Sequence, residues 1–132
     1  MSFVFNDGGR QAAGYKGRAG DCAARALAIA LQLDYDQAYR LVADTNADFG
    51  YSKSARNGIK KDVFHALLTD LGFKWYPAPV FDGRKAKCSD MPKGTVIARQ
   101  AHHFVAVIDG VPQDTWDSSN KMVYGYWAES SR

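Results

Sequence analysis

The sequence predicts an α+β domain in which N-terminal helices pack on a C-terminal antiparallel sheet. Residues 21–71 carry apolar side chains at helical spacing and are followed by Gly72. Residues 73–128 contain short apolar runs separated by turn-forming residues. Because helices and strands are segregated along the chain, two layers are expected rather than a parallel α/β sheet. The 132 residues suffice for a single domain with a core of its own.

The individual elements follow from the spacing of apolar residues and from the residues that interrupt it. Helices are expected over about 22–33, from Asp34 to about 43, and over about 59–71, with a polar loop over 44–58. Strands are expected over 3–5, 73–76, 95–99, 103–108, 111–116 and 123–127. Asp109 and Gly110 tolerate the positive φ angles of a two-residue turn, which predicts a hairpin with His103 opposite Trp116.

One cysteine, Cys22, stands at the expected start of the first helix. Asp21 is a suitable N-cap, because its carboxylate can accept hydrogen bonds from the free amides of the first turn. Those amides and the helix dipole favour an anion, which lowers the pKa of the Cys22 thiol and makes it a candidate nucleophile. The alternative is packing, since free cysteine is often buried as a small hydrophobic residue. Cys88 follows a lysine-rich stretch and is expected to be an exposed thiol without a role.

A cysteine nucleophile requires a base within hydrogen-bond reach and a third group that orients the base. His102 and His103 begin a strand, and because side chains alternate across a strand, only one of them can face the cysteine helix. The returning strand ends in Asp114-Thr115-Trp116-Asp117, which offers two carboxylates. The third histidine, His65, lies off the apolar stripe of its helix and is expected on the surface.

The segments around Cys22 and His103 resemble the papain-like cysteine peptidases. A Gly-Asp-Cys sequence enters an alanine-rich helix, and a His-Phe-Val-Ala-Val strand, a turn and Asp-Thr-Trp follow later in the chain. The similarity is greatest to small phage and bacterial members, and it implies one papain-like domain over residues 1–132. It also implies that Cys22 is the nucleophile, that His103 is the base, and that Asp114 orients His103, with His102 as a flanking residue.

Two other residues enter through this resemblance. Asp117 is the alternative third member, because it is nearer to His103 in register but needs a bulge to reach the same face. Lys16 stands six residues before the cysteine, where the family has a glutamine that completes the oxyanion hole. Its ammonium group is a candidate oxyanion donor beside the backbone N–H of Cys22, and the loss of such a donor typically costs about 10²–10³ in rate.

Composition sets limits on partners and location. The 17 basic and 14 acidic residues give a net charge of +3, which neither demands nor excludes an acidic partner. The two cysteines have no metal-ligand spacing, so no metal or cofactor is expected. No apolar signal segment or membrane-length run is present, so a cytoplasmic protein without a membrane partner is expected, in the host cytoplasm if the chain is phage-encoded.

Two clusters of cations raise the question of nucleic-acid binding. Neither is accompanied by aromatic stacking residues or a recognition motif, so this function is not favoured. The clusters are Lys53, Arg56, Lys60 and Lys61, and Arg84, Lys85 and Lys87.

Two functions therefore remain open. The first is a papain-like thiol hydrolase that acts on a peptide or protein substrate and cleaves a peptide, isopeptide or related acyl bond. The alternative is a catalytically silent papain-like binding module, such as a phage-type protein that captures a host factor. The sequence does not specify the oligomeric state.

Overall fold

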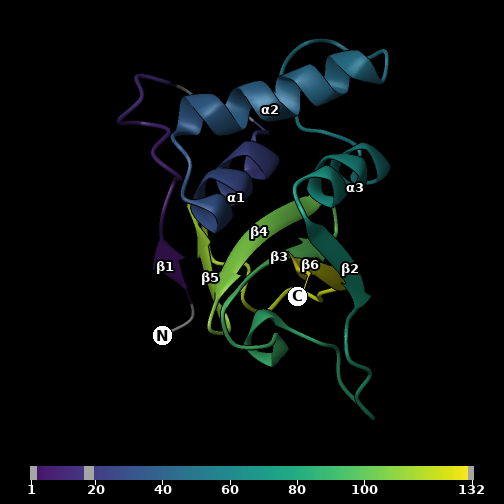
Figure 1. Cartoon of the computed structure of the whole chain (residues 1–132). Coiled ribbons are helices and arrows are strands. Elements are labelled where there is room, and N and C mark those ends of the chain that lie inside the picture. The colour runs from purple at the N-terminus through teal and green to yellow at the C-terminus, as the bar shows by residue number, and fades with distance from the viewer. Residues whose placement is uncertain (1–2, 17–19, 131–132) are drawn as a thin grey trace.

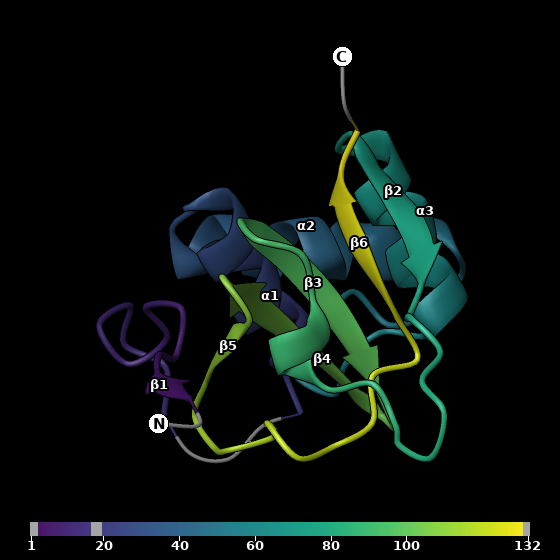
Figure 2. The same cartoon turned by 90° about the horizontal axis from the view of Figure 1, so that it is seen from below.

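Three α-helices cover one face of a six-stranded sheet in the computed structural model, which describes residues 3–16 and 20–130 (Figure 1). The helices are α1 (Cys22–Leu31), α2 (Tyr35–Asp48) and α3 (Lys61–Asp70). The strands are β1 (Val4–Phe5), β2 (Phe73–Pro77), β3 (Thr95–Gln100), β4 (His103–Ile108), β5 (Val111–Asp114) and β6 (Gly125–Glu129). A short 3₁₀ helix, η1 (Cys88–Asp90), lies on the other face of the sheet (Figure 2). The predicted α+β class is therefore confirmed.

The sheet is mixed rather than antiparallel. Its strand order is β1-β5-β4-β3-β6-β2, and β1 runs parallel to β5 while the other neighbours are antiparallel. Val4 lies opposite Gln113, and the amide of Asn6 extends this pairing by donating to the carbonyl of Asp114 at 2.8 Å. The prediction of an antiparallel, C-terminal sheet is wrong in this respect, because the N-terminal segment forms an edge strand beside the hairpin.

The hairpin of β4 and β5 has the predicted register. Ile108 lies opposite Val111 across a turn in which Asp109 and Gly110 have φ angles of 50° and 81°. Strand β5 ends at Asp114 rather than at Trp116. The next amide, that of Thr115, donates to the carboxylate of Asp114 at 2.7 Å instead of to a neighbouring strand.

Hydrophobic cores lie on both faces of the sheet. Phe104 and Ala106 of β4 pack with the helices, whereas Val105 and Val107 pack on the opposite face with η1. The alternation predicted for this strand is therefore observed. Cys88 belongs to the second core and is fully buried, so the prediction of an exposed thiol is wrong. Its apolar neighbours come from strands that are distant in the sequence.

Long-range contacts also change three local predictions. Helix α2 continues past its expected end at about residue 43, because the amide of buried Asn46 donates to the carbonyls of Ser54 and Gly58 and fixes the following loop. His65 is half-buried rather than solvated, and its Nδ1 accepts from Nε1 of Trp127 at 3.0 Å. Strand β6 begins after Val123, which is instead buried in the second core.

Candidate active site

Cys22 is the first residue of α1 and lines a cleft. Its side chain is partly exposed. The cleft has a volume of about 700 Å³ and lies between the first turn of α1, the segment before α3, the start of β4 and Trp116. We call it the Cys22 cleft; its lining includes Cys22, Arg25, Lys60, Arg99, His103 and Trp116. The thiol is therefore placed where a ligand in the cleft can reach it.

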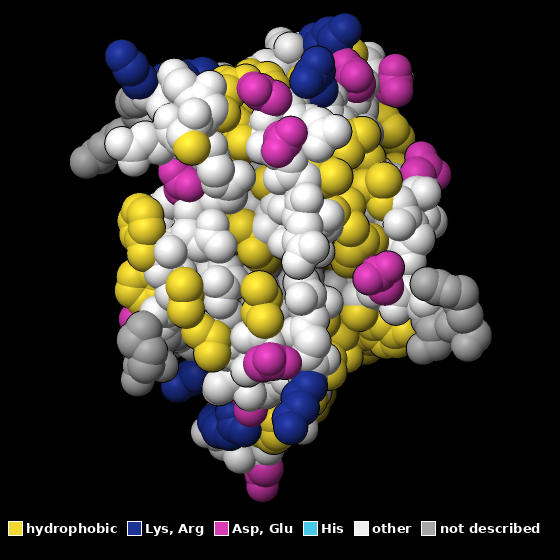
Figure 3. Space-filling view, turned by 60° about the vertical axis from the view of Figure 1, so that its left-hand side comes forward, with side chains coloured by type: hydrophobic (Ala, Val, Ile, Leu, Met, Phe, Trp, Pro, Cys, Tyr) yellow, Lys and Arg dark blue, Asp and Glu magenta, His cyan; other side chains and the backbone are white. Residues whose placement is uncertain are grey.

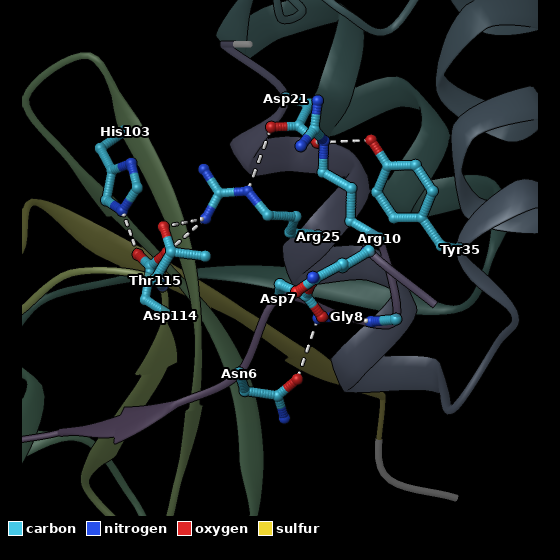
Figure 4. Close-up of polar contacts among 12 residues, drawn as sticks. Asn6, Asp7, Gly8, Arg10, Asp21, Arg25, Tyr35, His103, Asp114 and Thr115 are labelled. Atoms are coloured by element: carbon cyan, nitrogen blue, oxygen red, sulfur yellow. Dashed lines mark hydrogen bonds and ion pairs between the residues drawn. The ribbon is translucent and has the colours of Figure 1, made fainter. Parts of the chain in front are cut away.

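Asp21 is the N-cap residue of α1, but its side chain forms ion pairs instead of a capping hydrogen bond. Its side chain caps no helix amide. One carboxylate oxygen accepts from Nε of Arg25 at 3.1 Å, and the other accepts from the hydroxyl of Tyr35 (Figure 4). The second oxygen also pairs with Nε of Arg10 at 3.0 Å. The predicted N-cap position is confirmed, but the predicted capping bond is not formed, because two guanidinium groups and a tyrosine hydroxyl engage this carboxylate instead.

His103 lies between Cys22 and Asp114. Its Nε2 is 2.6 Å from Oδ2 of Asp114, and it lines the same cleft as Cys22, close enough that each residue shifts the pKa of the other. Because Nε2 is engaged by the carboxylate, the nitrogen left for the thiol is Nδ1. The ring is buried, and the ring of Trp116 packs on it with 4.8 Å between centroids. The structure thus brings together the three residues that the resemblance selects.

Asp114, and not Asp117, is the carboxylate beside His103. Asp114 is buried, and its Oδ1 accepts from the amide of Thr115 at 2.7 Å. Asp117 is exposed, and its carboxylate accepts from the amide of Ser119 at 2.9 Å. Since β5 ends at Asp114, no bulge returns Asp117 to the strand face.

The contacts around His103 shift three pKa values. Burial raises the pKa of Cys22, but the hydrogen bond and charge of His103, together with the Phe104 backbone and Arg25, lower it below the ordinary 9.0. Burial lowers the pKa of His103, whereas Asp114 and Cys22 raise it, to about 9. Burial raises the pKa of Asp114, but His103 and other partners hold it below its ordinary 3.8. These directions favour transfer of the thiol proton from Cys22 to His103.

Arg25 links the two carboxylates of the site. Its guanidinium is buried beneath the cleft; Nε binds Asp21, while Nη1 donates to Asp114 and, at 3.2 Å, to Oγ1 of Thr115 (Figure 4). No role for Arg25 was predicted from the sequence. The four-residue spacing from Asp21 to Arg25, which is typical of helical ion pairs, is the signal that could have identified it.

With Arg25 included, charges of opposite sign alternate through the site. Once the thiol proton is on His103, the series starts at the Cys22 thiolate and the His103 imidazolium and continues through one carboxylate, one guanidinium, a second carboxylate and a second guanidinium. Three anions thereby face three cations, which compensates the burial of most of them. The four further members are Asp114, Arg25, Asp21 and Arg10.

Two other predicted residues lie apart from the thiol. Lys16 is exposed and lines a second cleft, of about 780 Å³, rather than the Cys22 cleft. We call this the Arg10 cleft, after a residue that lines it together with Asp7, Tyr15 and Lys16. His102 is exposed on the rim of the Cys22 cleft with a φ angle of 52°, and it precedes β4 rather than forming part of it.

The site thus holds a thiol, an imidazole and a carboxylate beside a cleft, which are the groups that nucleophilic acyl transfer uses. Comparison of the chain with known protein families, curated proteins and solved structures found no match. Within residues 3–16 and 20–130, no helix is long and apolar enough to cross a membrane, and no three His, Cys, Asp or Glu side chains are grouped to hold a metal ion. Functional inference therefore depends on the site itself.

Proposed function

We propose that the protein is a papain-like thiol hydrolase that cleaves a peptide, isopeptide or related acyl bond through Cys22, His103 and Asp114. One observation supports this most strongly. Nε2 of His103 is 2.6 Å from Asp114, and His103 and Cys22 line one cleft and shift each other's pKa. This arrangement supplies a nucleophile, a proton carrier and an orienting carboxylate in the order that the chemistry needs.

The reaction proceeds in two halves. The Cys22 thiolate attacks the carbonyl carbon, and a C–S bond forms as the carbonyl π electrons move onto oxygen. Collapse of this tetrahedral adduct breaks the bond to the leaving amine, which takes the proton from the His103 imidazolium. Neutral His103 then removes a proton from water, whose oxygen attacks the thioester. The acid product leaves, and the thiolate–imidazolium pair is restored.

The negative oxygen of the adduct requires hydrogen-bond donors. The backbone N–H of Cys22 is the proposed donor, because it belongs to the first turn of α1, where amides have no partner within the helix. Lys16 lines the other cleft and is not assigned to this role. This departure from the expected donor favours the second candidate, a catalytically silent papain-like binding module of the kind that a phage could use to capture a host factor.

Acylation by p-nitrophenyl acetate separates the two candidates. A hydrolase is expected to release a burst of nitrophenolate equal to the enzyme concentration, with an acetyl group on Cys22 found by mass spectrometry. The Cys22→Ala variant should show no burst, whereas Cys88→Ala should retain it, because Cys88 is buried and its pKa is raised to about 12. Equal, slow acetylation in the wild type and in Cys22→Ala would support the binding module.

The pH dependence should differ between ester and amide substrates. Ester acylation needs only the thiolate, so its rate should rise through the lowered pKa of Cys22 and then remain level. Amide cleavage also needs a protonated His103, so its rate should fall again above about pH 9. The check is a pair of profiles from pH 5 to 10 with p-nitrophenyl acetate and a peptidyl anilide. An amide profile without the alkaline fall would remove His103 as the proton donor.

Substitution of the two candidate carboxylates should give unequal effects. Asp114→Ala is expected to lower the rate of peptidyl anilide cleavage about 10²–10⁴-fold, because His103 loses the partner that fixes its tautomer and raises its pKa. Asp114→Asn should be milder, since the amide oxygen can still accept from Nε2. Asp117→Ala is the matched control, and its rate should stay within about threefold of the wild type, because this carboxylate is exposed. A larger loss in Asp117→Ala would reverse the assignment.

A further inference from the structure

The Cys22 cleft is lined by cations and by no carboxylate among the described residues. Lys60, Lys61 and Arg99 line it, and Arg25 lies at its base. Arg25 is neutralised by Asp21 and Asp114, but the other three cations have no such neighbour. By contrast, acidic and basic side chains are mixed on the face shown in Figure 3, where no histidine is visible. The positive character is therefore a property of the cleft and not only of the net charge of +3.

Aromatic rings hold the three rim cations without cancelling their charge. The ammonium of Lys60 lies 5.5 Å from the ring centre of Tyr51, and that of Lys61 lies 4.3 Å from the ring of Trp75. The guanidinium of Arg99 lies 4.9 Å from the ring of Phe104. Cation–π contacts orient a cation and leave it available to an anion. Among the described residues, none of these three cations forms an ion pair with a carboxylate.

The positive lining continues past Trp116. Arg25 and Trp116 line both the Cys22 cleft and the Arg10 cleft, so the two clefts adjoin at these residues. The carboxylate of Asp7 in the Arg10 cleft is occupied by the amides of Gly9 and Gln11, each at 2.9 Å. An extended ligand can therefore run from one cleft to the other, over the thiol; the carboxylates that it meets in the described lining are Asp21, which is ion-paired, and Asp7, which is hydrogen-bonded to amides.

We propose that the Cys22 cleft recognises an acidic peptide segment, with Asp or Glu side chains next to the scissile acyl bond. This inference rests on the proposed function. The proposed reaction needs a ligand with an acyl bond, which a peptide has and the backbone of a nucleic acid lacks. The carboxylates of the segment pair with the rim cations Lys60, Lys61 and Arg99. The half-exposed Trp116 packs on the peptide backbone where it crosses between the clefts. Complementary charge of this kind governs specificity and the rate of encounter.

Peptidyl vinyl sulfones of one length provide the test, with Glu, Gln or Lys at the two positions before the electrophile. The second-order rate of Cys22 modification is measured by mass spectrometry for each probe. We expect the Glu probe to react about tenfold faster than the Gln probe, and the Lys probe to react slowest. The preference should fall in a Lys60→Ala/Lys61→Ala variant and with added salt.

The matched control is Lys93→Ala/Lys121→Ala, which removes the same charge at exposed positions outside both clefts and should keep the preference. Modification by iodoacetamide is measured in parallel. Selective alkylation of Cys22 with equal rates for the Glu and Gln probes would overturn the acidic-peptide inference alone. Absence of selective alkylation would overturn the proposed function itself. Stronger protection of Cys22 by oligothymidylate than by a glutamate peptide of equal charge would assign the cleft to nucleic acid and overturn the inference.

Discussion

Replacing His103 with alanine is expected to abolish the low-pH reactivity of Cys22. Burial alone raises the pKa of this thiol, and the hydrogen bond and charge of His103 are the largest opposing causes. Without them the pKa should return upward, and each unit of increase removes about nine-tenths of the thiolate at a pH below the pKa. Hydrolysis should fall by a further factor of about 10²–10⁴, because the proton carrier is lost as well.

The measurement is the rate of iodoacetamide alkylation of Cys22 from pH 5 to 10 in the folded protein. Cys88 serves as an internal control, since it is fully buried and should label only after unfolding. His102→Asn is the matched variant; asparagine tolerates the φ angle of 52° at this position, and the profile should not move. A His103→Ala profile that coincides with the wild type would refute the Cys–His pair.

Part of this site could be predicted from local sequence patterns. The Asp-Gly turn fixes the register of the hairpin, so the position of Asp114 relative to His103 follows from counting residues on each side. The helix beginning at Cys22 is likewise a local property of its sequence. What register could not decide was the choice between Asp114 and Asp117, because that depends on where β5 ends.

Long-range contacts account for what the sequence did not reveal. Asp21 has the chemistry of an N-cap, and only the position of Arg10 and Tyr35 in the fold diverts its carboxylate to ion pairing. Cys88 sits among polar neighbours in the sequence, yet η1 buries it against strands that follow later in the chain. The parallel pairing of β1 with β5 joins segments more than a hundred residues apart, and two residues of strand give no pattern from which to infer it.

Replacing Arg25 with methionine should cause the largest loss of stability among these predictions. The side chain is similar in length and apolar, so it can occupy the buried space, but it cannot donate to Asp21 or Asp114. Both carboxylates are almost fully buried and would each lose a cationic partner. Removing one member of a buried ion pair typically costs about 3–5 kcal/mol. Urea unfolding should show this as a lower midpoint with an unchanged slope.

Arg25→Lys should lie between methionine and the wild type, because an ammonium keeps the charge but cannot hold both carboxylates in the planar geometry of a guanidinium. Arg40→Met is the matched control, as Arg40 is exposed, and its effect should stay within about 0.5 kcal/mol.

The loss of stability in Arg25→Met should also depend on pH. The pKa of Asp114 is below 3.8 in the folded protein, so its contribution is present above that pH and is lost on acidification. Without Arg25 this pKa should rise and the acid transition should begin at higher pH. If Arg25→Met were as stable as the Arg40→Met control, water or other donors would have to satisfy both carboxylates. The position of Asp114 beside His103 would then not depend on the alternating charges.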